Sequence, residues 1–96
     1  MIKRYKGGLM LTRQYLKEIV VEAIKANGGQ STYVQIAQYI WQHYEPKLRE
    51  SGDLFFTWQY DIRWAVPTLR KSGILEKHDK NSGAKKSVIK LSKDQL

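Results

Sequence analysis

The chain has 96 residues, no cysteine and a formal charge of +8 at pH 7. This length suits one domain with one hydrophobic core, and the lack of cysteine excludes disulfide frameworks, thiolate zinc sites and thiol nucleophiles. No apolar run approaches the roughly 20 residues of a membrane-spanning helix, so we expect a cytoplasmic protein without a membrane partner. The basic charge favours a polyanionic partner, because fixed cations release counterions when they meet phosphates.

The excess positive charge is confined to the two ends of the chain. Residues 1–11 contain three cations and no acid, and residues 70–96 contain eight cations and three acids. Residues 12–69 contain six of each and are neutral overall. This distribution predicts a basic N-terminal arm (1–11), a domain (12–92) and a short tail (93–96). Disordered tails that only keep the protein soluble are the alternative interpretation.

The first predicted helix runs from Arg13 to Ala26. Its apolar residues recur at spacings of three and four, Thr12 offers an N-cap, and the run Asn27-Gly28-Gly29 provides the residues that end helices. A very short strand is expected at residues 30–31.

The second predicted helix runs from Tyr33 to Tyr44, with Thr32 as its N-cap. Its apolar face repeats with helical spacing. Pro46 should end it, because a proline disfavours the helical conformation of the residue before it. The segment 46–53 is then a linker.

The third predicted helix lies within residues 55–76, with Thr57 as its cap. At 100° per residue, one stripe should be core: Phe55, Trp58, Ile62, Ala65, Val66 and Leu69. The opposite side carries Tyr60, Arg63, Trp64, Pro67, Thr68 and Lys71, with Gln59 and Arg70 at its border. Pro67 should kink or split this helix.

After Ser72-Gly73 the pattern predicts a β-hairpin. Residues 74–79 and 86–91 are typical of strands, and residues 80–85 are typical of a basic turn. The predicted fold is therefore mainly α with a small β-hairpin (α+β). Three helices followed by a two-stranded wing form a winged helix-turn-helix.

Two runs in this region resemble a known family. Ile62-Arg63-Trp64-Ala65, followed by the run from Leu69 to Glu76 (L-R-K-S-G-I-L-E), resembles the N-terminal winged-helix domain of Mrr-type restriction proteins. That domain has a pattern close to V-R-W-A and then L-K-K-A-G-L-L-E before its wing. The resemblance covers residues 12–92 and implies a module that reads DNA, as in a restriction system or a transcription regulator. The chain departs from the family by lacking a recognisable nuclease domain and by carrying Pro67.

The outer side of the third helix supplies the candidates for base reading. Arginine pairs with guanine and glutamine with adenine in the major groove, which indicates Arg63 and Gln59. Tyr60 and Thr68 can reach a thymine methyl group or a phosphate. The alternative for Arg63 is a solvated helix cation, and for Trp64 we favour packing against the second helix, the wing or another subunit over a contact with nucleic acid.

Cations near the wing are expected to bind phosphates without reading bases. They are Lys71, Lys77, Lys80, Lys85 and Lys86. The basic arm offers a further contact to the backbone or the minor groove, through Lys3, Arg4 and Lys6.

Nothing in the sequence indicates an enzyme or a cofactor. His43 and His78 are isolated from other metal ligands and nucleophiles, and Gly28-Gly29 is better explained as a helix stop than as a phosphate loop. Double-stranded DNA is the expected partner, together with a second copy or a nuclease partner protein. The alternative is a winged helix that binds proteins through Trp41, Tyr44 and Trp64 without direct DNA contact.

Overall fold

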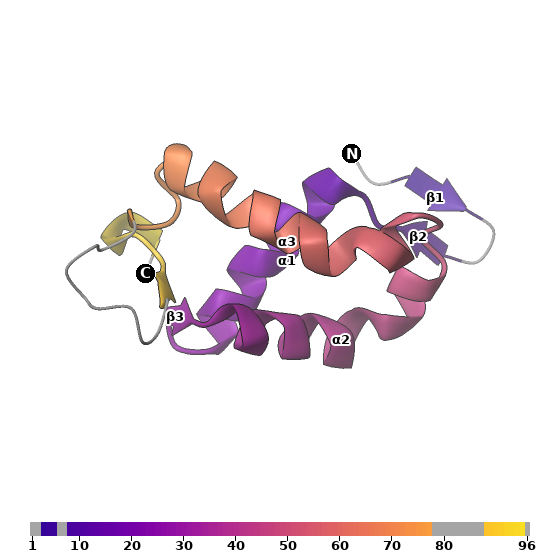
Figure 1. Ribbon diagram of the computed structural model, residues 1–96, viewed down its shortest axis with the longest axis horizontal. Coiled ribbons are helices and arrows are strands. Elements are labelled where there is room, and N and C mark those ends of the chain that lie inside the picture. Colours follow the sequence, from indigo (N-terminus) through magenta and orange to yellow (C-terminus); the bar gives the residue numbers. More distant parts are fainter. Residues whose placement is uncertain (1–2, 6–7, 78–87, 96) are drawn as a thin grey trace.

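The computed structural model describes residues 3–5, 8–77 and 88–95. Three helices dominate it: α1 (Arg13–Ala26), α2 (Tyr33–Arg49) and α3 (Leu54–Lys71). In the view of Figure 1, α1 crosses α3 and ends near the start of α2, and short strands lie at both ends of the molecule. The fold is mainly helical with small antiparallel sheets, as predicted. Among the described residues, no helix has the length and apolar character needed to cross a membrane.

Helix α1 has the predicted bounds. The Thr12 side chain accepts a hydrogen bond from the backbone N–H of Tyr15, which satisfies one of the free donors at a helix start. At the other end, Gly28 and Gly29 have φ of 86° and 100°. Side chains with a Cβ disfavour this left-handed region, so the pair ends the helix.

Helix α2 is longer than predicted. It has the expected Thr32 cap, completed by the Gln35 side chain in a capping box, but it continues through Pro46 to Arg49. The predicted end at Tyr44 was wrong. Leu48 is fully buried, and its burial stabilises the extra turn. Because Pro46 is exposed, water can hydrate the Gln42 carbonyl that receives no hydrogen bond from the proline.

Helix α3 starts three residues earlier than Thr57, the predicted cap. It begins at Leu54 after a short connection in which Gly52 has φ of 62°. Thr57 instead lies inside the helix and donates a hydrogen bond to Asp61 one turn later. Pro67 does not split the helix, which continues to Lys71. Because this side of the helix is exposed, water can hydrate the Arg63 carbonyl that receives no hydrogen bond from Pro67.

A small sheet joins the C-terminal part of the chain to the first inter-helix loop. β3 (Gln30–Ser31) pairs antiparallel with β4 (Ile89–Lys90), and Leu75 pairs antiparallel with Leu91. Residues 89–92 therefore lie between β3 on one side and the segment that follows α3 on the other. The predicted strands at 74–79 and 86–91 are shorter in the described residues, and the predicted turn at 80–85 lies outside them. A 3-10 helix (Lys93–Gln95) follows.

The N-terminal segment, predicted as a loosely held arm, contains a β-hairpin. β1 (Lys3–Tyr5) pairs antiparallel with β2 (Gly8–Met10). The next residue, Leu11, is buried, and its N–H donates to the buried Ser51 hydroxyl at 3.0 Å. This bond attaches the hairpin to the connection between α2 and α3, at the end of the molecule away from β3 and β4 (Figure 1).

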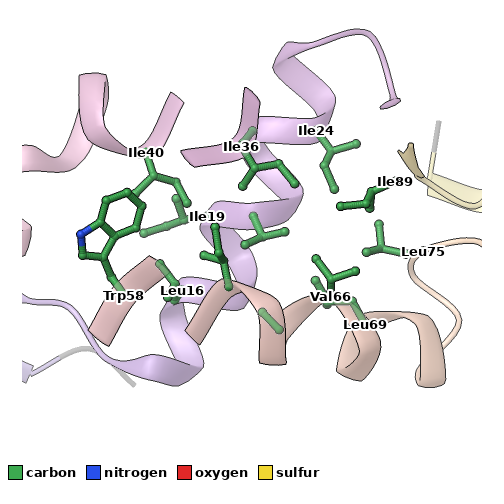
Figure 2. Close-up of a cluster of buried hydrophobic side chains, with 14 of the residues drawn as sticks. Leu16, Ile19, Ile24, Ile36, Ile40, Trp58, Val66, Leu69, Leu75 and Ile89 are labelled. Carbon is green, nitrogen blue, oxygen red and sulfur yellow. The ribbon is translucent and has the colours of Figure 1, made fainter. Parts of the chain in front are cut away.

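One hydrophobic core lies between the three helices and the small sheet. Figure 2 shows side chains from all of these elements converging on it. Of the α3 stripe predicted as core, the five residues Trp58, Ile62, Ala65, Val66 and Leu69 are buried. The sixth, Phe55, is half-buried at the edge of the core. The core residues labelled in the figure are Leu16, Ile19, Ile24, Ile36, Ile40, Trp58, Val66, Leu69, Leu75 and Ile89.

Candidate nucleic-acid interface

The outer face of α3 carries large exposed aromatic side chains. Phe56 is 83% exposed and Tyr60 is 80% exposed. They are four residues apart, so they lie on the same side of the helix, one turn from each other. Soluble proteins rarely leave contiguous apolar surface open without a function. This side of α3 is therefore the candidate binding surface.

A hollow of about 390 Å³ lies on this face. It brings together three of the predicted base-reading residues, Gln59, Tyr60 and Arg63. Its remaining lining is aromatic and comes from Phe55, Phe56 and Trp58. We call this surface the α3 hollow.

Arg63 is held in place by an aromatic ring and not by an acid. Its guanidinium carbon lies 4.7 Å from the centre of the Tyr33 ring, at the start of α2. This is the distance of a cation–π contact. The ion pairs found among the described residues join Arg13 to Asp61 and Arg49 to Glu45. Within that part of the chain the charge of Arg63 is therefore uncompensated, and it remains exposed.

The wall behind the α3 hollow is a stack of aromatic rings between α2 and α3. Trp41 and Trp58 are nearly parallel, with ring centres 6.2 Å apart. Arg49 lies 5.4 Å from the Trp41 ring and 5.3 Å from the Phe55 ring, and its charge is balanced by Glu45 at 2.8 Å. Trp58 forms the floor of the hollow, and the stack with Trp41 holds its ring in place.

The opposite side of α3 is closed by α1. The guanidinium carbon of Arg13 lies 3.7 Å from the centre of the Trp64 ring, and Arg13 also pairs with Asp61 at 3.6 Å. Trp64 is half-buried and packs against the core. Its role is packing, as favoured from the sequence, but its covering element is α1 and not α2.

Thr68 lies on this second side as well, apart from the other base-reading candidates. Its hydroxyl donates to the carbonyl of Trp64 at 2.9 Å. It lines a larger groove of about 790 Å³ between α1 and the end of α3, which contains charges of both signs on α1: Lys17, Glu18, Glu22 and Lys25. The structure therefore separates Thr68 from Gln59, Tyr60 and Arg63.

Only two of the predicted phosphate contacts fall within the residues that the structure describes, and both lie at or after the C-terminal end of α3. Lys71, at the end of the helix, and Lys77, after Leu75, are both exposed. Lys80, Lys85 and Lys86 lie outside the described residues, as does Lys6 of the arm. Lys3 and Arg4 belong to β1, at the same end of the molecule as the start of α3 (Figure 1).

Two tyrosines of α2 are structural anchors. Tyr39 and Tyr44 both donate hydrogen bonds to the Glu22 carboxylate of α1. Burial, followed by the hydrogen bond to Glu22, raises the pKa of Tyr44 above its ordinary value. The bond to Glu22 is the main cause that raises the pKa of Tyr39. Both groups therefore stay protonated and hold α2 against α1.

The described residues contain no cluster of three or more metal-ligating side chains. His43 stacks on Tyr39 with ring centres 4.1 Å apart, and His78 lies outside the described residues. Comparisons with known protein families, with curated proteins and with solved structures find no match for this chain.

The sequence interpretation missed Phe56, the most exposed aromatic side chain of the α3 hollow. The available signal was the spacing of Phe56 and Tyr60, which places two aromatics on the polar side of one helix.

Proposed function

We propose that the protein is a winged-helix module that binds double-stranded DNA. The support from the fold is the order of its elements: helix, strand, two helices and then two extended segments. β3 pairs with β4, and Leu75 pairs with Leu91. This pairing is the arrangement that a winged helix requires, with the last strand between the other two.

The observation that carries the proposal is Arg63, which pairs with no acid among the described residues and lies beside Gln59 and Tyr60 on the exposed side of α3. An α-helix of about 10–12 Å diameter fits the major groove, which is about 12 Å wide. In this position Arg63 would pair with guanine and Gln59 with adenine, while Tyr60 would contact a thymine methyl group or a phosphate. Thr68 is left out of the reading set, because its groove opens on the α1 side.

The basic segments would supply affinity. Lys71 and Lys77, with the sequence-predicted Lys80, Lys85 and Lys86, would bind phosphates beyond the end of α3. Lys3, Arg4 and Lys6 of the N-terminal arm would add contacts to the backbone or the minor groove. A reader of this kind fits the resemblance to the N-terminal domain of Mrr-type restriction proteins, in which a separate nuclease would cut the DNA. The module itself has no catalytic role and no cofactor in this proposal.

The alternative, a protein-binding surface formed by Trp41, Tyr44 and Trp64, has less support. Each of these rings has a partner within the chain, although Trp41 is 37% exposed. Trp41 stacks on Trp58, Tyr44 is bonded to Glu22, and Trp64 lies under Arg13.

The proposal is tested by titrating the full chain with a random-sequence duplex at about 50 and 200 mM salt. With six or more phosphate contacts, affinity should fall by at least about 10³-fold between these conditions. Replacing both Lys85 and Lys86 by glutamine should lower the salt slope by about one for each lost contact. If no duplex binds at low salt, the proposed function is wrong.

A further inference from the structure

The α3 hollow has more aromatic surface than reading a regular duplex requires. The edges of base pairs in the major groove offer hydrogen-bonding groups and, as apolar surface, the thymine methyl group. Phe56 and Tyr60 are each at least 80% exposed and project from one side of the helix. A flat apolar partner would cover these two rings more fully than base-pair edges can.

The hollow has the size and lining of a site for a single aromatic ring system. Its volume of about 390 Å³ lies within the range of about 300–1,000 Å³ for small-molecule sites. Phe56 and Tyr60 offer ring faces, Gln59 offers an amide that both donates and accepts, and Arg63 offers donors and a positive charge. Proteins recognise unpaired bases with this combination of stacking and edge hydrogen bonds.

The local charge favours a nucleic acid over a second copy of the chain. The acids within α2 and α3 are engaged, Asp61 with Arg13 on the other side of α3 and Glu45 with Arg49. The exposed cap residues Glu50 and Asp53 lie at the far end of the α3 hollow from Arg63 along the sequence. A two-fold dimer through this face would bring Arg63 of both copies into one interface, whereas an anionic backbone would neutralise Arg63.

We propose that the α3 hollow binds one unpaired nucleobase, so that the protein prefers duplex DNA containing an unstacked nucleotide to a continuous duplex. Phe56 and Tyr60 stack on the base, Gln59 bonds its edge, and Arg63 binds the edge or the neighbouring phosphate. The Trp58 ring, held by Trp41, forms the floor. This inference rests on the proposed function and specifies its preferred substrate.

The test compares two duplexes of one sequence, one fully paired and one with a single extra 2-aminopurine nucleotide. Binding of the full chain to each is measured by fluorescence anisotropy, together with the emission of the 2-aminopurine. We expect binding to the bulged duplex to be about ten-fold tighter, since stacking of one base on an aromatic side chain supplies this order of affinity. The emission should be quenched as the base stacks.

Two substitutions at Phe56 separate stacking from apolar contact. Phe56→Leu keeps apolar bulk but removes the ring, and it should reduce the ten-fold preference to less than about two-fold. Phe56→Tyr keeps the ring and should retain the preference. Because Phe56 is 83% exposed, both variants should fold, which circular dichroism verifies. Val34→Ala, at a 65% exposed apolar position of α2, is the matched surface control and should behave as wild type.

The outcomes distinguish this inference from the proposed function. Equal, salt-dependent affinity for both duplexes would overturn the inference and leave the proposed function standing. A bulge preference that survives Phe56→Leu would overturn the assignment of the base to this hollow. Self-association in sedimentation that Phe56→Leu abolishes would identify a second copy as the occupant and also overturn it. Absence of binding to either duplex would overturn both proposals.

Discussion

The two sides of α3 use the same residue types with opposite results. On the α1 side, Arg13 covers Trp64 at 3.7 Å and is neutralised by Asp61. On the α2 side, Arg63 lies over Tyr33 at 4.7 Å, outside the ion pairs of the described chain. The first arrangement holds two helices together, and the second leaves a cation and two aromatic rings open to a partner. The presence or absence of an acid partner therefore distinguishes the two cation–aromatic pairs in the described chain.

The two sides also differ in the size of their hollows. The groove on the α1 side is about twice the volume of the α3 hollow, at about 790 against 390 Å³. Its α1 wall carries two lysines and two glutamates, so it has no net attraction for a polyanion. We therefore place the DNA on the smaller hollow.

The largest expected effect is on stability. Trp64→Ala should lower the free energy of unfolding by about 2 kcal/mol, because it removes a half-buried ring and its contact with Arg13. Urea denaturation at 25 °C measures this change. Tyr60→Ala, on the exposed side, is the matched control and should stay within about 0.5 kcal/mol of wild type. If Tyr60→Ala is the more destabilising change, the two sides have been assigned the wrong way round.

The second effect is on sequence preference. Arg63→Ala should cost about 1–3 kcal/mol on the preferred duplex and much less on random duplexes, because a lost base contact reduces specificity. Competition titrations on both kinds of duplex measure the difference.

Arg13→Ala is the matched control for Arg63→Ala, since it removes an arginine that also lies over an aromatic ring. It should leave DNA binding unchanged and lower the stability by about 0.5–1 kcal/mol. If Arg63→Ala lowered the affinity for every duplex equally, Arg63 would bind the DNA backbone and would not read bases.

The smallest effect concerns the α1–α2 contact at alkaline pH. The folded state raises the pKa of Tyr44 above 10.0, so its stabilising contribution is complete below about pH 10 and is lost as the pH rises beyond that value. Tyr44→Phe should therefore lose less stability than wild type between pH 8 and pH 11. Urea midpoints at the two pH values provide the measurement, and identical pH dependence in both proteins would contradict the anchoring role.

Sequence patterns predicted the elements whose signals are local. Helix α1 was predicted with its bounds because Thr12 and the glycine pair at 28–29 act on their immediate neighbours. Helix α2 overran its prediction because the burial of Leu48, a tertiary effect, outweighed Pro46. Leu54 similarly extended the start of α3.

The candidate site was predicted only in part, for a related reason. Helical spacing places Gln59, Tyr60 and Arg63 on the polar side of α3, and the structure brings them into one hollow. Spacing does not say which neighbouring helix covers which edge of that side. For this reason Thr68 was grouped with Gln59, Tyr60 and Arg63, although it lies in the groove beside α1. Phe56 was overlooked.

The most direct test of the central claim is an NMR titration, in which the chemical shifts of the full chain are measured as a short duplex is added. We predict that the backbone amides of Gln59, Tyr60 and Arg63 shift, together with the indole N–H of Trp58 on the hollow's floor. The indole N–H of Trp64, beneath Arg13, should not shift. Shifts confined to Trp64 and the α1 groove would contradict the placement of DNA on the outer face of α3.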